Sequence, residues 1–218
     1  MQSRLFGIMS VMLMMIGCVS APDRYDYSRF RAENPRSILV VPVVSKSVDV
    51  NAPDYFLATI SLPLAERGFY VFPVNMVRSV LADDGLSDAN MVHAGDPNRL
   101  GELFGADSVM YISIERWDAK YVVFSTSVTV ELNYSLKSVR TGEVLWKNHQ
   151  VLVYQPKSNA GSGLAGLIAD AITAAVTKAA PNYMPLAHQA NNQAIYVKGV
   201  GLPAGPYDGL FLKDSDAF

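Results

Sequence analysis

The side chains best suited to proton transfer or metal binding are scattered along this sequence. The histidines are His93, His149 and His188, which fall in an expected loop, strand and late helix. No two of them have the spacing of metal ligands on one helix, and the single cysteine, Cys18, is far from all three. The adjacent carboxylates of Asp83 and Asp84 fall at an expected helix end, where they are more simply solvated. We therefore predict structural or surface histidines and no metal site.

Two glycine-rich stretches are weak matches to phosphate-binding loops. GVGLPAG at 199–205 is followed by no expected helix, and GSG at 161–163 precedes a helix but contains no lysine. The G-x-S-x-G motif of serine hydrolases is absent from the sequence. These observations predict a protein that is not an enzyme and that needs no dissociable cofactor.

The elements that would have to position any site belong to a chain of globular composition. The sequence has 218 residues, of which 50% are hydrophobic and 17% charged, enough for one domain with a core. Its net charge of −2 and isoelectric point of about 5.9 lack the basic excess of nucleic-acid-binding proteins. We expect one domain and no nucleic-acid partner.

The first residues have the layout of a secretory signal. Arg4 precedes an apolar run at 5–16, which is shorter than the roughly 20 residues of a membrane-spanning helix. The run ends in MIGC at 15–18, which resembles the bacterial lipobox, in which a small residue precedes the cysteine that receives lipid. We expect residues 1–17 to be a signal peptide and Cys18 to carry diacylglycerol and an N-acyl chain. The alternative is an N-terminal core helix that happens to contain a cysteine.

Lipid on Cys18 would determine where the protein is found. One acyl chain binds a bilayer only marginally, whereas two or three on one residue anchor it almost irreversibly. Val19 stands after the cysteine in place of aspartate, and by resemblance to bacterial lipoproteins this favours the outer membrane. The expected location is the outer-membrane bilayer, with the domain facing the periplasm or exposed at the cell surface.

Residues 18–36 are polar, contain two prolines and predict a solvated tether. At about 3.3–3.6 Å per extended residue, roughly 18 residues would hold the domain up to about 60 Å from the bilayer. An alternative role for Arg24, Arg29 and Arg31 is contact with lipid head groups.

Residues 37–198 predict a single mixed α/β domain. Short apolar strands are expected at 37–44, 69–73 and 106–117, with helices within 52–68, 74–85 and 96–105. Strands that alternate with helices indicate βαβ units and a parallel sheet. Pro63 leaves open whether the first helix is kinked or begins near Ala58, whereas Asp96 and Pro97 indicate the start of the third helix.

An antiparallel hairpin is expected next, with strands at 122–139 and 143–155 joined at RTGE. If Val139 faces Val144, every second residue of 130–136 lies on one buried apolar face. Gly142 favours another turn, of three residues with a bulge, which shifts the pairing by one residue. We choose the first register because the shift would bury a row of polar side chains.

A helix is expected within 162–180, followed by a second helix at about 182–195 and an irregular tail at 199–218. The first carries a stripe of small residues four apart, at Gly161, Ala165, Ala169, Thr173 and Thr177. Such a stripe permits close approach of a neighbouring element. It packs on the sheet in the simpler interpretation and forms a self-association or partner interface in the other. In the tail, YDGLF at 207–211 is a candidate docking segment.

Several stretches together point to one known family. They are the lipobox, SILVVPVV at 37–44, LAERGFYVFPV at 64–74, LGELFGADSVMYISIERW at 100–117, RTGEVLWK at 140–147 and GLPAGPY at 201–207. They resemble a family of bacterial outer-membrane lipoproteins of unassigned function, whose best-known type is a meningococcal genome-derived antigen. More distantly, GAD before a strand and TGEVLW on a hairpin look like the CsgG and TolB N-terminal group.

This resemblance implies a non-catalytic interaction module in a multi-lipoprotein envelope assembly or in a transport or secretion system. The expected partners are the outer-membrane bilayer, other envelope lipoproteins and a second copy of the chain. The alternative function is a periplasmic carrier of a small apolar ligand.

Overall fold

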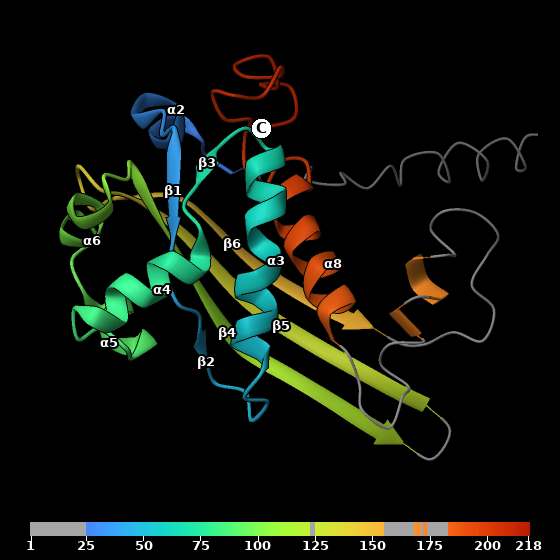
Figure 1. Ribbon diagram of the computed structural model, residues 1–218. Helices are drawn as coiled ribbons and strands as arrows, with labels where there is room; N and C mark the ends of the chain where they lie inside the picture. Colours follow the sequence, from blue (N-terminus) through green and yellow to red (C-terminus); the bar gives the residue numbers. More distant parts are fainter. Residues whose placement is uncertain (1–24, 123–124, 155–167, 171, 174–182) are drawn as a thin grey trace, which may run out of the picture.

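A six-stranded mixed sheet runs through the computed structural model, which describes residues 25–122, 125–154, 168–170, 172–173 and 183–218 (Figure 1). The strands are β1 (Ser37–Val40), β2 (Val44–Ser45), β3 (Tyr70–Val71), β4 (Ser108–Val122), β5 (Ser125–Ser138) and β6 (Val144–Tyr154). Their order is β3-β1-β4-β5-β6, and β2 also pairs with β4. β1 is parallel to β3 and β4, whereas β4, β5 and β6 are antiparallel. The predicted α/β class, with a parallel part followed by a hairpin, is confirmed.

Helices cover both faces of the parallel part of the sheet and one face of its antiparallel part. They are α2 (Ser28–Glu33), α3 (Ala52–Glu66), α4 (Val74–Asp83), α5 (Ala89–Ala94), α6 (Pro97–Phe104) and α8 (Met184–Tyr196). Along β1, Ile38 and Val40 belong to the core cluster formed with α3 and α8, which lie side by side in Figure 1. Leu39 of the same strand and Val41, directly after it, pack instead with α4, α5 and α6. Because successive strand residues point to opposite faces, β1 is buried on both sides.

Local sequence accounts for the ends of these helices. The Asp96 side chain accepts a hydrogen bond of 3.0 Å from the backbone N–H of Asn98, and Gly105 ends α6 at φ 71°, as predicted. α3 begins at Ala52 and continues through Pro63, so the alternative start near Ala58 is wrong.

The predicted register of the β5–β6 hairpin is wrong by one residue. Val130 pairs with Leu152, and a bulge lies between Leu136 and Lys137. In the turn, Gly142 has a φ of 72° and its N–H donates to the Ser138 carbonyl at 3.0 Å. Only a residue that tolerates positive φ suits this turn, so turn geometry decided the register rather than hydrophobic patterning.

The one-residue shift in the β5–β6 register turns polar side chains of β6 toward α8, where they form hydrogen bonds. Asn148 Nδ2 donates to the Ala194 carbonyl at 2.9 Å, and Gln150 Nε2 donates to Gln193 Oε1 at 3.1 Å. The cost of burial that we assigned to this register is therefore offset by hydrogen bonds to the helix.

The predicted tether is wrong for residues 25–36, which belong to the folded domain. Tyr27 and Phe30 are 6% and 4% exposed and join the main core cluster. The Tyr27 hydroxyl donates to the Gly201 carbonyl at 2.7 Å. Two aromatic side chains three residues apart, one at the N-cap and one within the helix, thus fix α2 although most of its residues are polar.

The 199–218 segment has no helix or strand, as predicted, but it packs closely on the domain. The buried Asp214 carboxylate accepts hydrogen bonds from Arg31 Nη2 at 2.9 Å and from Arg67 Nη2 at 3.1 Å. It also accepts one from the Ala204 N–H at 2.7 Å. This Asp214 cluster joins α2, the end of α3 and the C-terminal segment, so the segment is part of the domain.

Two members of the small-residue stripe lie among the described residues. The Tyr154 hydroxyl, at the end of β6, donates to the Ala169 carbonyl at 2.8 Å and lies 2.5 Å from Thr173 Oγ1. Ala169 and Thr173 therefore contact their own sheet. Gly161, Ala165 and Thr177 lie outside the described residues, as do the expected signal peptide and Cys18. Within the described ranges, no helix has the length and apolarity to cross a membrane.

Candidate functional site

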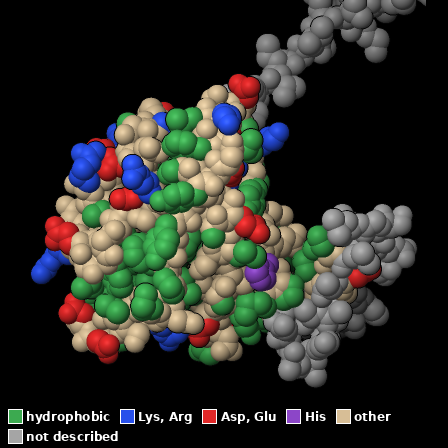
Figure 2. Space-filling view, turned by 45° about the horizontal axis from the view of Figure 1, so that its top comes forward, with side chains coloured by type: hydrophobic (Ala, Val, Ile, Leu, Met, Phe, Trp, Pro, Cys, Tyr) green, Lys and Arg blue, Asp and Glu red, His purple; other side chains and the backbone are tan. Residues whose placement is uncertain are grey.

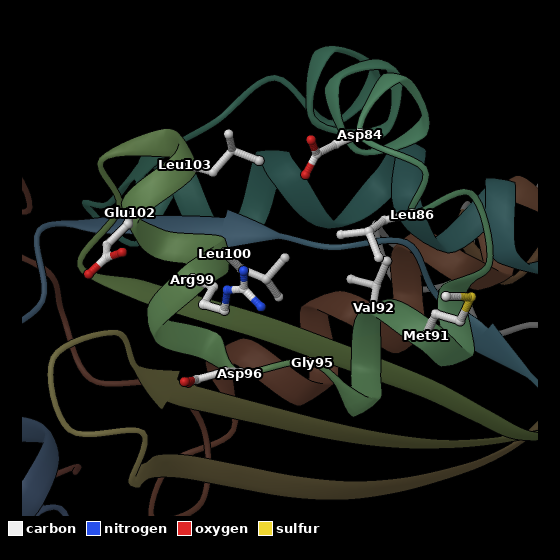
Figure 3. Close-up of a pocket in the computed structure, with 10 residues that line it drawn as sticks. All are labelled: Asp84, Leu86, Met91, Val92, Gly95, Asp96, Arg99, Leu100, Glu102 and Leu103. Atoms are coloured by element: carbon white, nitrogen blue, oxygen red, sulfur yellow. The ribbon is translucent and has the colours of Figure 1, made fainter.

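A hollow of about 600 Å³ lies between the end of α4, α5 and α6 (Figure 3). Its aliphatic lining consists of Leu86, Met91, Val92, Leu100 and Leu103. Carboxylates and one guanidinium, from Asp84, Asp96, Glu102 and Arg99, complete the lining. We call this hollow the α4–α6 groove.

The short helices position the apolar side chains of the groove. Val92 of α5 and Leu100 of α6 are 1% and 4% exposed and anchor the helices on the sheet. Met91 and Leu103 are 55% and 47% exposed, so large apolar surface stays in contact with solvent beside them. Exposed apolar surface that is bordered by charges is typical of interaction sites.

The helices that form the groove carry an excess of negative charge. Residues 74–104 contain five carboxylates and two arginines. Figure 3 shows the Asp84 carboxylate turned toward the hollow. No ion pair of the described residues includes Arg99. The groove therefore suits a partner that combines apolar side chains with basic ones.

Catalytic chemistry does not converge on this groove. His93, His149 and His188 do not line it. His93 belongs to α5, where its Nε2 is 2.9 Å from the Pro42 carbonyl and its ring packs edge-on against Tyr111; burial lowers the pKa of this histidine. In the part of the chain that the structure describes, no group of three or more histidine, cysteine and acidic side chains could hold a metal ion.

A second candidate surface is the face of β4, β5 and β6 that points away from α3 and α8. It carries a chain of polar contacts through Lys46, Glu115, Asn133, His149, Glu131 and Arg116. Asn133 is central to it, because its Nδ2 donates to Glu115 Oε1 at 3.0 Å and its Oδ1 lies 2.8 Å from His149 Nδ1. We call this set the open-face network.

Charge pairing organises both ends of the open-face network. At one end Lys46 Nζ lies 2.6 Å from Glu115 Oε2, and this hydrogen bond is the main reason that the pKa of Glu115 is lowered. At the other end Arg116 Nη2 lies 2.8 Å from Glu131 Oε2, and His149 Nε2 lies 3.6 Å from Glu131 Oε1. The predicted surface role of His149 agrees with this position.

Sequence reasoning predicted one buried and one polar face for the hairpin, but it identified neither the groove nor the open-face network as a candidate site. The sequence of α6 did contain a signal for the groove. Leu100 is enough to pack the helix on the sheet, so the additional apolar residues Leu103 and Phe104 indicate a second apolar surface. α5, which supplies Met91, was predicted as loop because its six residues are too few to show a helical period.

Comparison with known proteins identifies a family of α/β lipoproteins. Residues 25–207 match the family model described as Putative lipoprotein GNA1162-like, and the chain belongs to this family. The chain is 31% identical over 196 residues to the putative lipoprotein NMB1124/NMB1162 of Neisseria meningitidis serogroup B. The alignment covers 90% of this chain and 89% of that protein.

A solved structure supports the fold. The crystal structure of lipoprotein GNA1162 from Neisseria meningitidis superposes with a TM-score of 0.56 and 34% sequence identity, covering 64% of this chain and 96% of that chain. The predicted lipoprotein family is thereby confirmed. The more distant resemblance to the CsgG and TolB N-terminal group stays a prediction.

Proposed function

We propose that this chain is an outer-membrane lipoprotein, anchored through acylated Cys18 and facing the periplasm, whose domain is a non-catalytic interaction module. In this role it binds other proteins of a multi-lipoprotein envelope assembly or transport system. Membership of a lipoprotein family supports the anchor, and the lipobox at 15–18 supports the acylated residue.

The α4–α6 groove is the observation that carries the interaction role. An aliphatic floor with exposed Met91 and Leu103 matches the apolar face of an amphipathic helix, and methionine adapts to the shape of its partner. The acidic excess of α4–α6 favours basic side chains beside that apolar face. The partner segment is therefore an amphipathic, basic stretch of another envelope protein.

Metabolic labelling tests the anchor. Bacteria that express the wild-type chain in medium with radiolabelled palmitate are expected to label it and to retain it in the outer-membrane fraction. Cys18→Ser removes the acylated thiol and abolishes both, whereas the neighbouring Ser20→Ala leaves both unchanged. An unlabelled wild-type chain, or a labelled Cys18→Ser chain, contradicts the proposal.

Defined peptides test the groove. Two helical peptides share one leucine face and differ only in whether lysine or glutamate flanks it, and fluorescence anisotropy measures their binding. The lysine peptide is expected to bind more tightly. Leu103→Asn weakens its binding by about ten- to a hundredfold, because burial of one leucine side chain contributes about 1.5–3 kcal/mol.

Leu62→Asn is the matched control, because Leu62 is an exposed leucine (55%) on α3, which does not line the groove. Equal losses for Leu62→Asn and Leu103→Asn, or tighter binding of the glutamate peptide, contradict the proposed site.

A carrier of a small apolar ligand is the second candidate function. The groove supports it through its size, because ligand pockets usually enclose about 300–1,000 Å³. Native mass spectrometry of gently extracted protein separates the two functions. A bound small molecule that Leu103→Asn displaces favours the carrier, and its absence favours the interaction module.

A further inference from the structure

The 207–212 loop exposes three large apolar side chains in the C-terminal segment. Tyr207, Leu210 and Leu212 are 69%, 54% and 60% exposed. The tail prediction singled out this stretch as a docking segment, and neither the groove nor the open-face network includes it.

The domain holds this loop firmly in place. The Tyr207 N–H donates to the Gly68 carbonyl at 3.1 Å, and a Cβ at Gly68 would lie only 2.3 Å from the Asp208 nitrogen. Two residues beyond the loop, Asp214 is fixed by Arg31 and Arg67. The exposure of the loop is therefore built into the fold.

Backbone geometry adds an independent observation. Leu212 has a φ of 57°, in the left-handed region that leucine rarely adopts. Such conformations persist only where the surrounding structure imposes them, and they concentrate at functional positions. Here the unusual conformation belongs to a leucine that is presented to solvent.

The loop belongs to the end of the domain where the chain leaves toward Cys18. The Tyr25 N–H donates to the Gly199 carbonyl at 3.0 Å, and the Gly199 N–H donates to the Ala217 carbonyl at 2.7 Å. Figure 1 shows the C-terminal segment and the start of the described chain at the same end. Tyr25 is seven residue steps from Cys18, and seven steps of extended chain span at most about 25 Å. An anchor on Cys18 therefore holds this end close to the bilayer.

We infer that the 207–212 loop rests on the bilayer surface and places Tyr207, Leu210 and Leu212 in the interfacial layer of the lipid. This inference rests on the proposed anchor. Tyrosine is enriched at membrane–water interfaces, and lysine stems such as that of Lys213 extend along apolar surface while the charge stays in water. Because the anchor makes the contact intramolecular, a small apolar surface suffices.

The charges at this end show that the contact is apolar rather than electrostatic. The 198–218 segment contains Lys198 and Lys213 beside Asp208 and Asp216, and its third aspartate, Asp214, is paired with arginines, so neither sign predominates. Figure 2, which brings this end forward, shows basic and acidic side chains interspersed there. The loop is therefore expected to bind zwitterionic and anionic bilayers alike.

Quenching by brominated lipid tests the inference on acylated protein in liposomes. Acylation consumes the Cys18 thiol, so Leu210→Cys provides a unique site for an environment-sensitive fluorophore. Val48→Cys is the control, because Val48 is 93% exposed in the loop between β2 and α3, at the other end of the domain in Figure 1. We expect at least twofold quenching at position 210 and none at 48, with and without phosphatidylglycerol in the phosphatidylcholine liposomes.

A second measurement uses the unlabelled wild-type protein. Hydrogen exchange at 207–213 is expected to slow several-fold on liposomes relative to the Cys18→Ser protein in solution, with no change at 46–51. Two outcomes overturn this inference alone. In one, the protein floats with liposomes but shows neither quenching at position 210 nor slowed exchange at 207–213; in the other, these effects require phosphatidylglycerol. Protein without lipid on Cys18 overturns it together with the proposed anchor.

Discussion

The parallel and antiparallel parts of the sheet satisfy their two faces in different ways. In the parallel part, β1 is buried on both faces because helices lie above and below it. In the antiparallel part, β5 turns Val130, Leu132 and Tyr134 toward α3 and α8, whereas Glu131 and Asn133 on its other face join the open-face network. On one side of the sheet the helices therefore cover only the parallel strands. The same side of β4, β5 and β6 instead carries hydrogen-bonded and ion-paired polar side chains.

The difference gives the domain two surfaces of contrasting chemistry. Parallel strands need helical crossovers, and three short helices in those crossovers form the apolar α4–α6 groove. Antiparallel strands need only tight turns, so one face of β4, β5 and β6 is free to be polar. A partner that recognises apolar surface is therefore directed to the parallel part.

Large-to-small substitution gives the widest contrast between the two parts. Leu39→Ala opens a cavity between β1 and α4–α6 and is expected to lower the free energy of unfolding by about 2–5 kcal/mol. Val151→Ala acts on the free face of β6, where Val151 is 48% exposed, and should cost less than about 0.5 kcal/mol. Urea unfolding of the 18–218 chain with Cys18→Ser measures both, and similar losses would refute the contrast.

Paired asparagine substitutions sharpen the contrast between the two faces of β5. On the buried face, Asn191 accepts from the Tyr134 hydroxyl at 2.8 Å and donates to Thr59 Oγ1 at 2.8 Å. Asn191→Ala takes the acceptor away from the buried Tyr134 hydroxyl, whereas Thr59 Oγ1 keeps its hydrogen bond of 2.7 Å to the Tyr55 carbonyl; the change should cost about 1–3 kcal/mol. Asn133→Ala on the open face exposes its partners to water and should cost under about 1 kcal/mol.

Urea midpoints at constant m-value report both costs. If Asn133→Ala were as destabilising as Asn191→Ala, the open face would be as tightly coupled to folding as the core.

The smallest expected effect is a pH-dependent one on the open face. The hydrogen bond from Lys46 lowers the pKa of Glu115 from its ordinary value of 4.5. This hydrogen bond therefore stabilises the fold fully above pH 4.5, and the stabilisation is lost as the pH falls and Glu115 becomes protonated. Because the Lys46 side chain is 64% exposed, Lys46→Met should cost under about 1 kcal/mol at neutral pH. The difference in the free energy of unfolding between Lys46→Met and the wild type should shrink in high salt and vanish in acid. A difference that persists in acid would mean that packing of the lysine stem causes it.

The parallel part was predictable because each of its signals is local. The apolar run at 37–44 fixes a buried strand, and Asp96, Pro97 and Gly105 mark both ends of α6. The hairpin register was not predictable from the same kind of pattern. It depends on the positive φ of one residue, Gly142, and on partners for Asn148 and Gln150 that only α8 supplies.

The two ends of the domain and its groove depend on contacts between distant segments. The short helix α2 is stable because Tyr27 and Phe30 enter a core built by later residues. The groove exists because helices at 74–104 pack with Met91 and Leu103 left outward, and composition alone does not show which apolar residues remain exposed. Acylation of Cys18, in contrast, is a prediction that rests on sequence and on family.

The Asp214 cluster has a consequence for the order of events during export. Arg31 and its carboxylate partner are separated by 183 positions, and Arg67 and the same carboxylate by 147. If the chain is exported through a translocation channel, as the proposed anchor requires, both guanidinium groups lack this carboxylate until the last residues emerge. A chain truncated before position 214 would lack the carboxylate that joins α2 to the end of α3, and α2 would become more accessible to proteases.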